Sequence, residues 1–512
     1  MKRCDIALLG VDGLHLVNPD VAGRAGHLQA PPPGLAEAVA QLETEDPASR
    51  RAARLLSVLS LFPRGEYLDS IRRFDHSQPF YAQDAHRLIE LGLIDTTEIP
   101  NIGSVSARTN AKSLVAKRPV REYLTGHLPL DVIERFNRQA LVLYFGEQWT
   151  SGAIKPPKGT RFDERTCESW KIDNATLLIM REAKDAIDAG VELRVTNSVT
   201  LADSYCTALY NGAHYESLVR AADDFLAIYR DLEGHQYRRT NIESLLGRAL
   251  RMCGDHEKSI AVLTKIVDSQ LSNSAKSSIL ISLALATESL GLDDETLRYA
   301  QKCIEIDSGS REALQARSVV ASIESKDHPK RKEKLLKLAR EAHKCGATTI
   351  ASNLRLQCMQ EEDDKQEKLK LARQVFEDAR TNGNDEYNAM RAMLHICKMC
   401  VSNAMPLSDL DLTKVIDAYQ YLVNEAMDGL FVLAHSVLWR HFALTGDVTN
   451  LLSLFRHSSF KWQLRGKATQ DRKYATEVSN LLAKKSHSGA VRPSREIAYL
   501  FWRSGQSLRL LD

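Results

Sequence analysis

Two cysteines three positions apart, Cys397 and Cys400, have the spacing that comes closest to a chemical site in this sequence, and His395 lies beside them. Thiolates and imidazoles are ligands that zinc prefers, but a structural zinc site needs four ligands, and no second pair follows at a suitable spacing. Both cysteines also fall in a long helical pattern, where a reduced thiol packs as a small hydrophobic group. The pattern therefore predicts buried thiols and no metal.

Elsewhere the spacing of residues indicates no catalytic site, because we find no Ser-His-Asp arrangement, no paired carboxylates and no His-x-x-x-His. His343 and Cys345 are two positions apart, so they would not share a helix face. Phe460 and Trp462 lie in a basic stretch and could stack on a nucleic-acid base, although packed aromatics with a solvated basic rim are commoner. We predict a protein that is not an enzyme and has no cofactor.

The composition is that of an ordinary helical protein. Its 68 Lys and Arg residues nearly balance its 66 Asp and Glu residues, so a net charge of +2 draws the chain neither to nucleic acid nor to a membrane. No run of 18 or more apolar residues occurs, and the nine cysteines are an odd number, which is typical of reduced intracellular thiols. We expect a cytoplasmic protein of two or three domains.

The stretch 241–306 contains a helix–turn–helix pattern twice. The two copies are 37 residues apart, whether measured from Gly247 to Ala284 or from Gly254 to Gly291. Small residues stand where two helices must approach closely, and a glycine stands where a helix ends in a left-handed turn. A tetratricopeptide unit is about 34 residues long and has this layout. Two unrelated helical hairpins are the alternative. The predicted repeat positions are Gly247, Leu250, Gly254, Ser259, Leu263, Ala284, Gly291 and Ala300.

A different pattern precedes the repeats. Asp46-Pro47 can cap and start a helix, a short helix passes through Leu68 and Ile71, and a third helix over 83–91 ends at Gly92. Two short extended pieces are expected at 93–95 and 104–106. Three helices and a small β-hairpin make a winged-helix layout, which suggests DNA binding by helix 83–91. That helix has about as many acids as bases, whereas DNA binding requires several cations, so we consider nucleic acid an unlikely partner.

The sequences of 55–65, 88–94 and 119–124 resemble the winged-helix segment of STAND-class signalling NTPases, the NB-ARC and NACHT proteins that include NLR-like proteins. In many of these proteins tetratricopeptide repeats follow the winged helix, and the resemblance covers roughly 46–310. The closing motif comprises Lys117, Arg118, Pro119, Arg121 and Tyr123. Family members often place a histidine near this motif against bound ADP. Lys117 or Arg118 corresponds to it here, and either residue could face a phosphate or lie solvated on the surface.

One part of the family pattern is missing. A STAND NTPase needs a phosphate-binding loop, G-x-x-x-x-G-K-[ST], and the sequence contains none, since Gly10-Val11-Asp12-Gly13 lacks the following Lys. The resemblance therefore implies the C-terminal half of such a protein, either split, truncated or degenerate, with the nucleotide-binding domain before residue 1.

We accordingly predict a mostly α-helical protein in which a winged-helix domain precedes a tetratricopeptide-like α-solenoid. The predicted segments are an N-terminal remnant (1–45), a winged-helix-like domain (46–125), a helical linker (126–195), tetratricopeptide-like repeats (196–325), and degenerate helical repeats with a C-terminal cap helix at 494–503 (326–512). The repeats would bind a protein or peptide partner, and a separate nucleotide-binding subunit is a further candidate partner. A winged-helix transcription regulator with a tetratricopeptide effector domain is the alternative.

Overall fold

The computed structural model describes residues 34–97, 113–154, 169–487 and 500–505, apart from short gaps inside these ranges. The described chain is mostly α-helical with one small antiparallel sheet, as the sequence predicted. It divides into two compact units, which among the described residues are 34–97 with 113–144 and 145–154 with 169–505. The predicted linker 126–195 is thereby shared between the units. None of the described helices combines the length and the apolar character needed to cross a bilayer.

The first unit combines several helices with the only sheet among the described residues. Its elements are α2 (Leu35–Thr44), α3 (Pro47–Leu59), β1 (Glu66–Tyr67), α4 (Leu68–Ile71), α5 (Ala82–Glu90), β2 (Ile94–Thr97), β3 (Ser113–Ala116), α6 (Arg118–His127) and α7 (Leu130–Phe145).

Helix α3 begins as the sequence predicted. Asp46 accepts hydrogen bonds from the backbone nitrogens of Ala48 and Ser49 at 2.7 and 2.8 Å, and Pro47 occupies the first turn, where no partner for its nitrogen is needed. Leu55 and Leu59 on its inner face are fully buried. Burial of this face anchors the helix in the core of the first unit.

The sheet differs from the predicted hairpin. Strand β3 lies in the centre, antiparallel to β1 and β2, and pairs Ala116 with Ile94. The strand that pairs with β2 is therefore 113–116, whereas the extended piece predicted at 104–106 lies outside the described residues. Gly65 has a φ of 82° and lies close against this strand. A Cβ atom at this position would be 2.5 Å from Val115 Cγ2 and 2.7 Å from the Leu114 backbone oxygen, so only glycine fits without a shift.

The second unit is a long series of helices. Its elements are η3 (Trp149–Ser151), α8 (Ser169–Asp188), α9 (Glu192–Asn211), α10 (Tyr215–Ile228), α11 (Gln236–Cys253), α12 (His256–Ile266), α13 (Asn273–Ser289), α14 (Asp293–Ile306), α15 (Arg311–Glu324), α16 (Arg331–Lys344), α17 (Thr348–Gln360), α18 (Lys365–Asn382), α19 (Glu386–Ser402), α20 (Asp409–Asn424), α21 (Asp428–Thr445), α22 (Val448–Leu464) and α23 (Ala468–His487).

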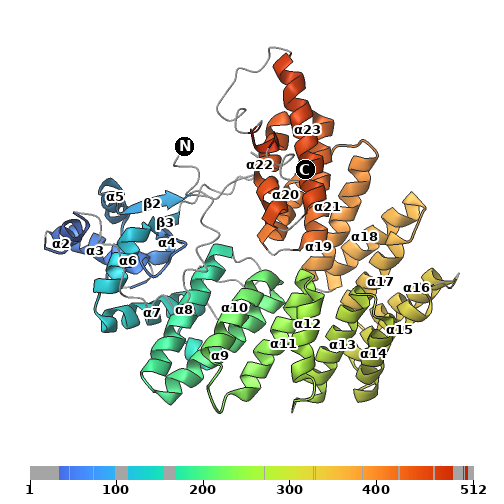
Figure 1. The fold of residues 1–512 in the computed structure, drawn as a ribbon, viewed down its shortest axis with the longest axis horizontal. Helices are drawn as coiled ribbons and strands as arrows, with labels where there is room; N and C mark the ends of the chain where they lie inside the picture. The colour runs from blue at the N-terminus through green and yellow to red at the C-terminus, as the bar shows by residue number, and fades with distance from the viewer. Residues whose placement is uncertain are drawn as a thin grey trace. The chain divides into compact units, whose positions relative to one another are not determined.

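Each helix from α10 to α19 packs against the next helix along the chain, and Figure 1 shows α8 to α18 side by side in sequence order. Further contacts join next-but-one helices, running from α9 through α11 and α13 to α15, and from α17 through α19 to α21. The odd-numbered helices therefore form two runs of next-but-one contacts, one from α9 to α15 and one from α17 to α21. This regular packing of neighbours distributes the hydrophobic core along the series, because no helix pair buries its apolar faces alone.

Helix α16 begins at Arg331 in a charged stretch, and its buried face starts only at Leu335. Helices α17 and α23 lie in the segment predicted as degenerate helical repeats, but the sequence analysis identified neither of them individually. The proposed cap helix 494–503 lies almost wholly outside the described residues.

Candidate functional site

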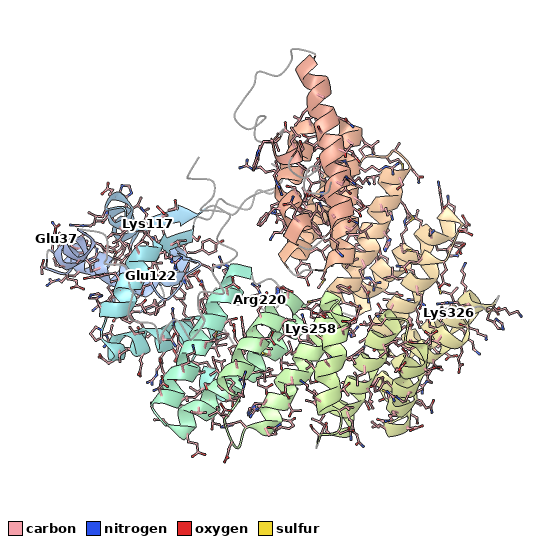
Figure 2. All side chains as sticks on the ribbon, in the orientation of Figure 1. Glu37, Lys117, Glu122, Arg220, Lys258 and Lys326 are labelled. Atoms are coloured by element: carbon pink, nitrogen blue, oxygen red, sulfur yellow. The ribbon has the colours of Figure 1, made fainter. Side chains whose placement is uncertain are left out.

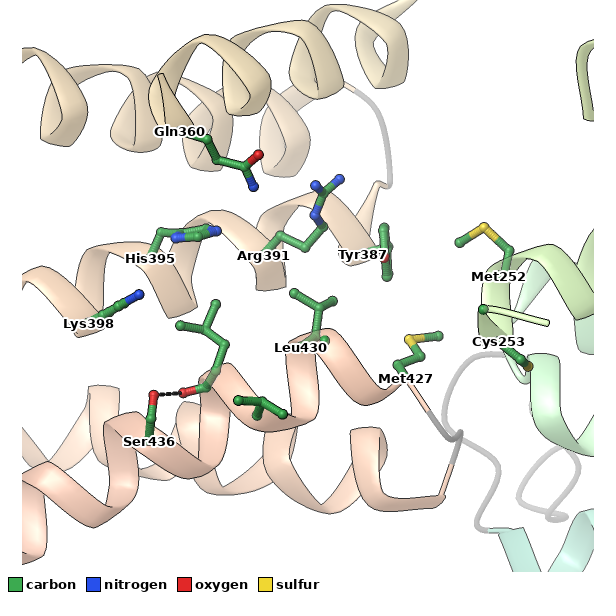
Figure 3. Close-up of a pocket in the computed structure, with 14 residues that line it drawn as sticks. Met252, Cys253, Gln360, Tyr387, Arg391, His395, Lys398, Met427, Leu430 and Ser436 are labelled. Atoms are coloured by element: carbon green, nitrogen blue, oxygen red, sulfur yellow. Dashed lines mark hydrogen bonds between the residues drawn. The ribbon is translucent and has the colours of Figure 1, made fainter. Parts of the chain in front are cut away.

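A groove of about 540 Å³ lies within the second unit, between the C-terminal end of α11 and helices α19 and α21 (Figure 3). We call it the α19–α21 groove. Its lining comes from four odd-numbered helices and the residues that cap them. The lining residues are Met252, Cys253, Gly254, Gln360, Tyr387, Arg391, His395, Lys398, Met427, Gly429, Leu430, Val432, Leu433 and Ser436.

Helix α19 supplies one wall of the groove. Tyr387, Arg391, His395 and Lys398 follow one another at spacings of four, four and three residues, so they lie along one face of the helix. Figure 3 shows this row of side chains facing Leu430 across the groove. The wall is thus polar and basic, and its arrangement follows directly from the helical repeat.

The guanidinium of Arg391 is held in place by neutral groups. Its Nη1 donates hydrogen bonds to Asn353 Oδ1 on α17 and to Asn388 Oδ1 on α19, both at 3.0 Å, and the group lies 5.5 Å from the ring centre of Tyr387. Within the described part of the chain, no carboxylate forms an ion pair with Arg391 or Lys398. Among the described residues, the positive charges on this wall therefore have no carboxylate partner.

The pKa of His395 reports the same positive field. Burial lowers this pKa, and the positive charges of Arg391, Lys398 and Lys368 lower it further, to about 4. His395 is therefore neutral near pH 7 and can donate or accept a hydrogen bond. No Asp or Glu occurs among the described residues that line the groove.

Helix α21 supplies an apolar wall. Leu430, Val432 and Leu433 are half-buried at the groove, and Met427 is buried at its end. The hydroxyl of Ser436 donates to the backbone oxygen of Leu433 at 2.7 Å, so it presents little free polarity. A basic wall thus faces an aliphatic wall.

The repeat positions predicted from the sequence lie mainly between helices and not in the groove. Ser259 Oγ donates to the backbone oxygen of Gly247 at 2.6 Å, and Gly247 lies against Leu263. Gly254 ends α11 at φ 88°, the left-handed conformation expected of a turn glycine, and it lines the groove. The remaining predicted positions are three buried residues and one turn glycine at φ 73°, namely Leu250, Ala284, Ala300 and Gly291.

The residues predicted to form a winged-helix closing motif make no convergent site in the first unit. Lys117 lies 3.6 Å from Asp95, and Arg118 lies 2.7 Å from Glu122, so both cations are matched by carboxylates on the surface. Figure 2 labels Lys117 and Glu122 in this unit.

The other residues of this motif make contacts within the first unit. Pro119 lies in the first turn of α6. Arg121 Nη1 donates to the backbone oxygen of Pro63 at 3.2 Å, and burial lowers the pKa of this arginine. The ring of Tyr123 stacks on His127 with centres 4.1 Å apart. The Arg121 bond joins α6 to the turn after α3, whereas the contact of Tyr123 with His127 lies within α6.

The basic side chains of helix α5 also lie against carboxylates. Arg87 lies 3.5 Å from Asp46, and His86 lies 3.2 Å from Glu90. A helix that reads DNA needs cations free to neutralise phosphates. The pairing leaves α5 with little capacity for that role.

The cysteine pair has the environment of structural thiols. Cys397 is buried with its Sγ 3.7 Å from Met393 Sδ, and burial raises its pKa to about 12, while Cys400 is half-buried. All seven described cysteines are free, and no group of three metal-ligating side chains occurs in the described residues.

The other candidates from the sequence are also accounted for. His343 Nδ1 lies 3.7 Å from Asp378 Oδ2, and Cys345 is exposed. Trp462 is fully buried with its ring centre 4.3 Å from that of Phe431, so its ring cannot stack on a base. The glycines at 10 and 13 lie outside the described residues.

Sequence reasoning missed the groove residues on α19 and α21. The only local signal is the row Tyr387, Arg391, His395 and Lys398 on one face of a helix whose other face is apolar. Comparison with known proteins adds no relative to this picture, since no protein-family model matches the chain and no curated protein matches it significantly. A function has to be inferred from the fold and the groove.

Proposed function

We propose that this chain is a non-enzymatic interaction scaffold, in which a tetratricopeptide-like α-solenoid binds a protein or peptide partner in the α19–α21 groove. One observation carries the proposal: α11 contributes to a single groove together with residues of α17, α19 and α21 that are more than 100 residues further along the chain. Stacked helical repeats typically present such an extended binding surface.

The interface between α11 and α12 supports a tetratricopeptide-like repeat. Gly247 allows Leu263 to approach α11, and the hydroxyl of Ser259 bonds to the backbone there. In the next copy, 37 residues further on, Ala284 corresponds to Gly247, Thr296 to Ser259 and Ala300 to Leu263, and all three are fully buried. A small residue at 247 and again at 284 supports one structural solution used twice.

The first unit supports the resemblance to a STAND regulatory arm only in outline, through short helices and a small sheet. In this proposal, a nucleotide-binding domain or subunit docks on the winged-helix unit in the cytoplasm, and a ligand on the repeats shifts a two-state equilibrium. Isothermal titration with ATP tests one consequence. We expect the chain alone to bind none, and stoichiometric binding would contradict the missing phosphate-binding loop.

A winged-helix transcription regulator is the second candidate. The contacts of Arg87 with Asp46 and of His86 with Glu90 count against it. Titration of a labelled DNA duplex at several salt concentrations separates the two functions, because specific or non-specific DNA binding weakens steeply as salt rises. Tight, salt-dependent duplex binding would favour the regulator.

Peptide selection tests the scaffold directly. Random peptides displayed on phage are selected on the full chain, and hydrogen exchange then maps where the selected peptides bind. We expect protection in α11, α19 and α21, and loss of binding in Leu430→Glu but not in Leu290→Glu. Leu290 is a matched control, since it is exposed on the surface and does not line the groove. Selected peptides that protect only other surfaces would refute the proposal.

A further inference from the structure

We propose that the α19–α21 groove selects a peptide segment whose carboxylate side chains lie along one edge and whose aliphatic side chains lie along the other. The inference rests on the proposed function, because it names the chemistry of the partner that the scaffold binds. Four features of the groove support it: the bonding of Arg391, the charge of the α19 wall, the apolar surface of α21, and the placement of the two walls opposite each other.

Arg391 is oriented before any ligand arrives. Both of its hydrogen bonds to Asn353 and Asn388 use Nη1, so the donors on Nε and Nη2 are not taken by these amides. A guanidinium has five N–H donors, and two parallel donors match a carboxylate. Because the amide oxygens are neutral, the group keeps its full charge while losing much of its freedom. A carboxylate bound there would gain a charge-assisted bond at a small cost in side-chain entropy.

The remaining charges near this wall have the same sign. Lys398 is exposed on the same face of α19, and the positive charge of Lys368 also acts on His395. A single carboxylate would neutralise only part of this field. Two or more acids, spaced along the row from Arg391 to Lys398, would neutralise it better. This favours an acidic segment over an isolated anion.

The opposite wall requires an apolar partner. Leu430, Val432 and Leu433 remain half-exposed, and burying this surface stabilises a complex by about 25 cal/mol per Å² before other costs. Met252 and Met427 border the groove, and their flexible thioethers can adapt to aliphatic side chains of different shapes.

The two walls face each other across one groove, as Figure 3 shows. An extended peptide directs alternate side chains to opposite sides. A segment that alternates acidic and aliphatic residues would therefore place its carboxylates on α19 and its aliphatic groups on α21 at the same time. A purely apolar peptide would match only the α21 wall, and a basic peptide would match neither wall.

The test uses fluorescein-labelled peptides and the full chain, with anisotropy as the measurement. The first probe is Ser-Glu-Leu-Glu-Val-Glu-Leu-Ser, the second has Gln for every Glu, and the third has Ser for every aliphatic residue. We expect the first to bind, and each change to raise Kd about tenfold or more. Binding of the first probe should also weaken with added salt. Equal affinity for the Glu and Gln peptides would overturn the proposal.

Substitutions in the groove test the same preference for acidic peptides. Arg391→Gln should raise Kd for the acidic probe about tenfold, and Arg391→Lys should restore part of the loss, because it keeps the charge but not the paired donors. If Arg391→Gln unfolds the chain, Lys398→Gln tests the same charge preference, and it should also raise Kd for the acidic probe. Lys398 makes no hydrogen bond within the described chain, so its replacement should not disturb the fold. Lys370→Gln is the matched control, being exposed on α18 beside Glu367. An unchanged Kd in both groove variants would refute the assignment.

Failure of this inference differs from failure of the proposed function. If selected peptides protect α11, α19 and α21 but carry no acidic residues, the scaffold stands and the charge preference is wrong. If no peptide of any composition binds there, the scaffold function itself is wrong.

Discussion

Ser259 Oγ donates a 2.6 Å hydrogen bond to the backbone oxygen of Gly247, which joins helices α11 and α12 where they pack closely. Both residues are buried, and a Cβ at position 247 would lie 2.5 Å from Cγ and Cδ2 of Leu263. The close approach therefore depends on the missing side chain of one helix and the small polar side chain of the other.

Gly247→Ala should destabilise the second unit. Alanine is favoured over glycine in a helix by about 1 kcal/mol, but forcing a methyl group against a buried leucine typically costs about 1–3 kcal/mol. We expect a net loss of about 1 kcal/mol in the free energy of unfolding, measured by denaturant titration. Gly429→Ala is the control, because no atom lies within 4 Å of the Cβ it would add. A stability gain in Gly247→Ala would show that α12 moves aside without cost.

Asp84→Asn should destabilise the first unit. The buried carboxylate of Asp84 accepts bonds from Arg51 Nε at 3.2 Å, from Arg51 Nη2 at 3.1 Å and from the Tyr81 backbone nitrogen at 2.8 Å. Loss of a charged acceptor of this kind costs about 2 kcal/mol. Hydrogen exchange of amides in α3 and α5 measures the change. The exposed pair of Asp69 and Arg72 provides the control, and Asp69→Asn should have an effect below about 0.5 kcal/mol.

Acid should destabilise the C-terminal part of the second unit. Burial, helped by His457 and Lys473, lowers the pKa of His435 to about 3, and burial and Lys461 lower the pKa of His457 to about 4. The ordinary value is 6.5, so the unfolded chain binds these protons first. The contribution of these two neutral histidines to the free energy of unfolding is therefore fully present above pH 6.5. It falls as the pH drops towards 4, by about 3 kcal/mol for His435 alone.

Unfolding measured at several pH values tests this dependence. His435→Gln should flatten the curve between pH 6.5 and 4, because the substituted side chain takes up no proton on unfolding. His86→Gln is the control on an exposed helix face. A native chain whose stability does not change between pH 7 and 4.5 would contradict the prediction.

The cysteines should differ sharply in reactivity. Only the thiolate attacks iodoacetamide, and with a pKa of about 12 roughly one Cys397 thiol in ten thousand is ionised at pH 8. Burial also shields Cys397 and Cys206, whereas Cys345 is exposed. Peptide mass spectrometry should find Cys345 alkylated in the folded chain and the other two only after unfolding. Early alkylation of Cys397 would mean that α19 opens locally.

Local sequence patterns located many helices but failed where burial surrounds a helix. Asp46-Pro47 marked the start of α3 and Gly254 the end of α11, because capping and left-handed turns depend on a few adjacent residues. Helix α17 escaped prediction since Ile350, Leu354 and Cys358 are buried together with residues on its other faces, so no single apolar stripe marks it.

The sequence by itself determined the helical character of this protein, the closely approaching pair Gly247 and Ser259, and the 37-residue offset of the repeat, because each follows from short-range spacing. Only the tertiary structure decided that β3 pairs with both β1 and β2, and that Arg391 faces Leu430 in a groove that Met252 also lines. Those neighbours depend on strand pairing across long connections and on small rotations that accumulate over many stacked helices, which no local pattern encodes.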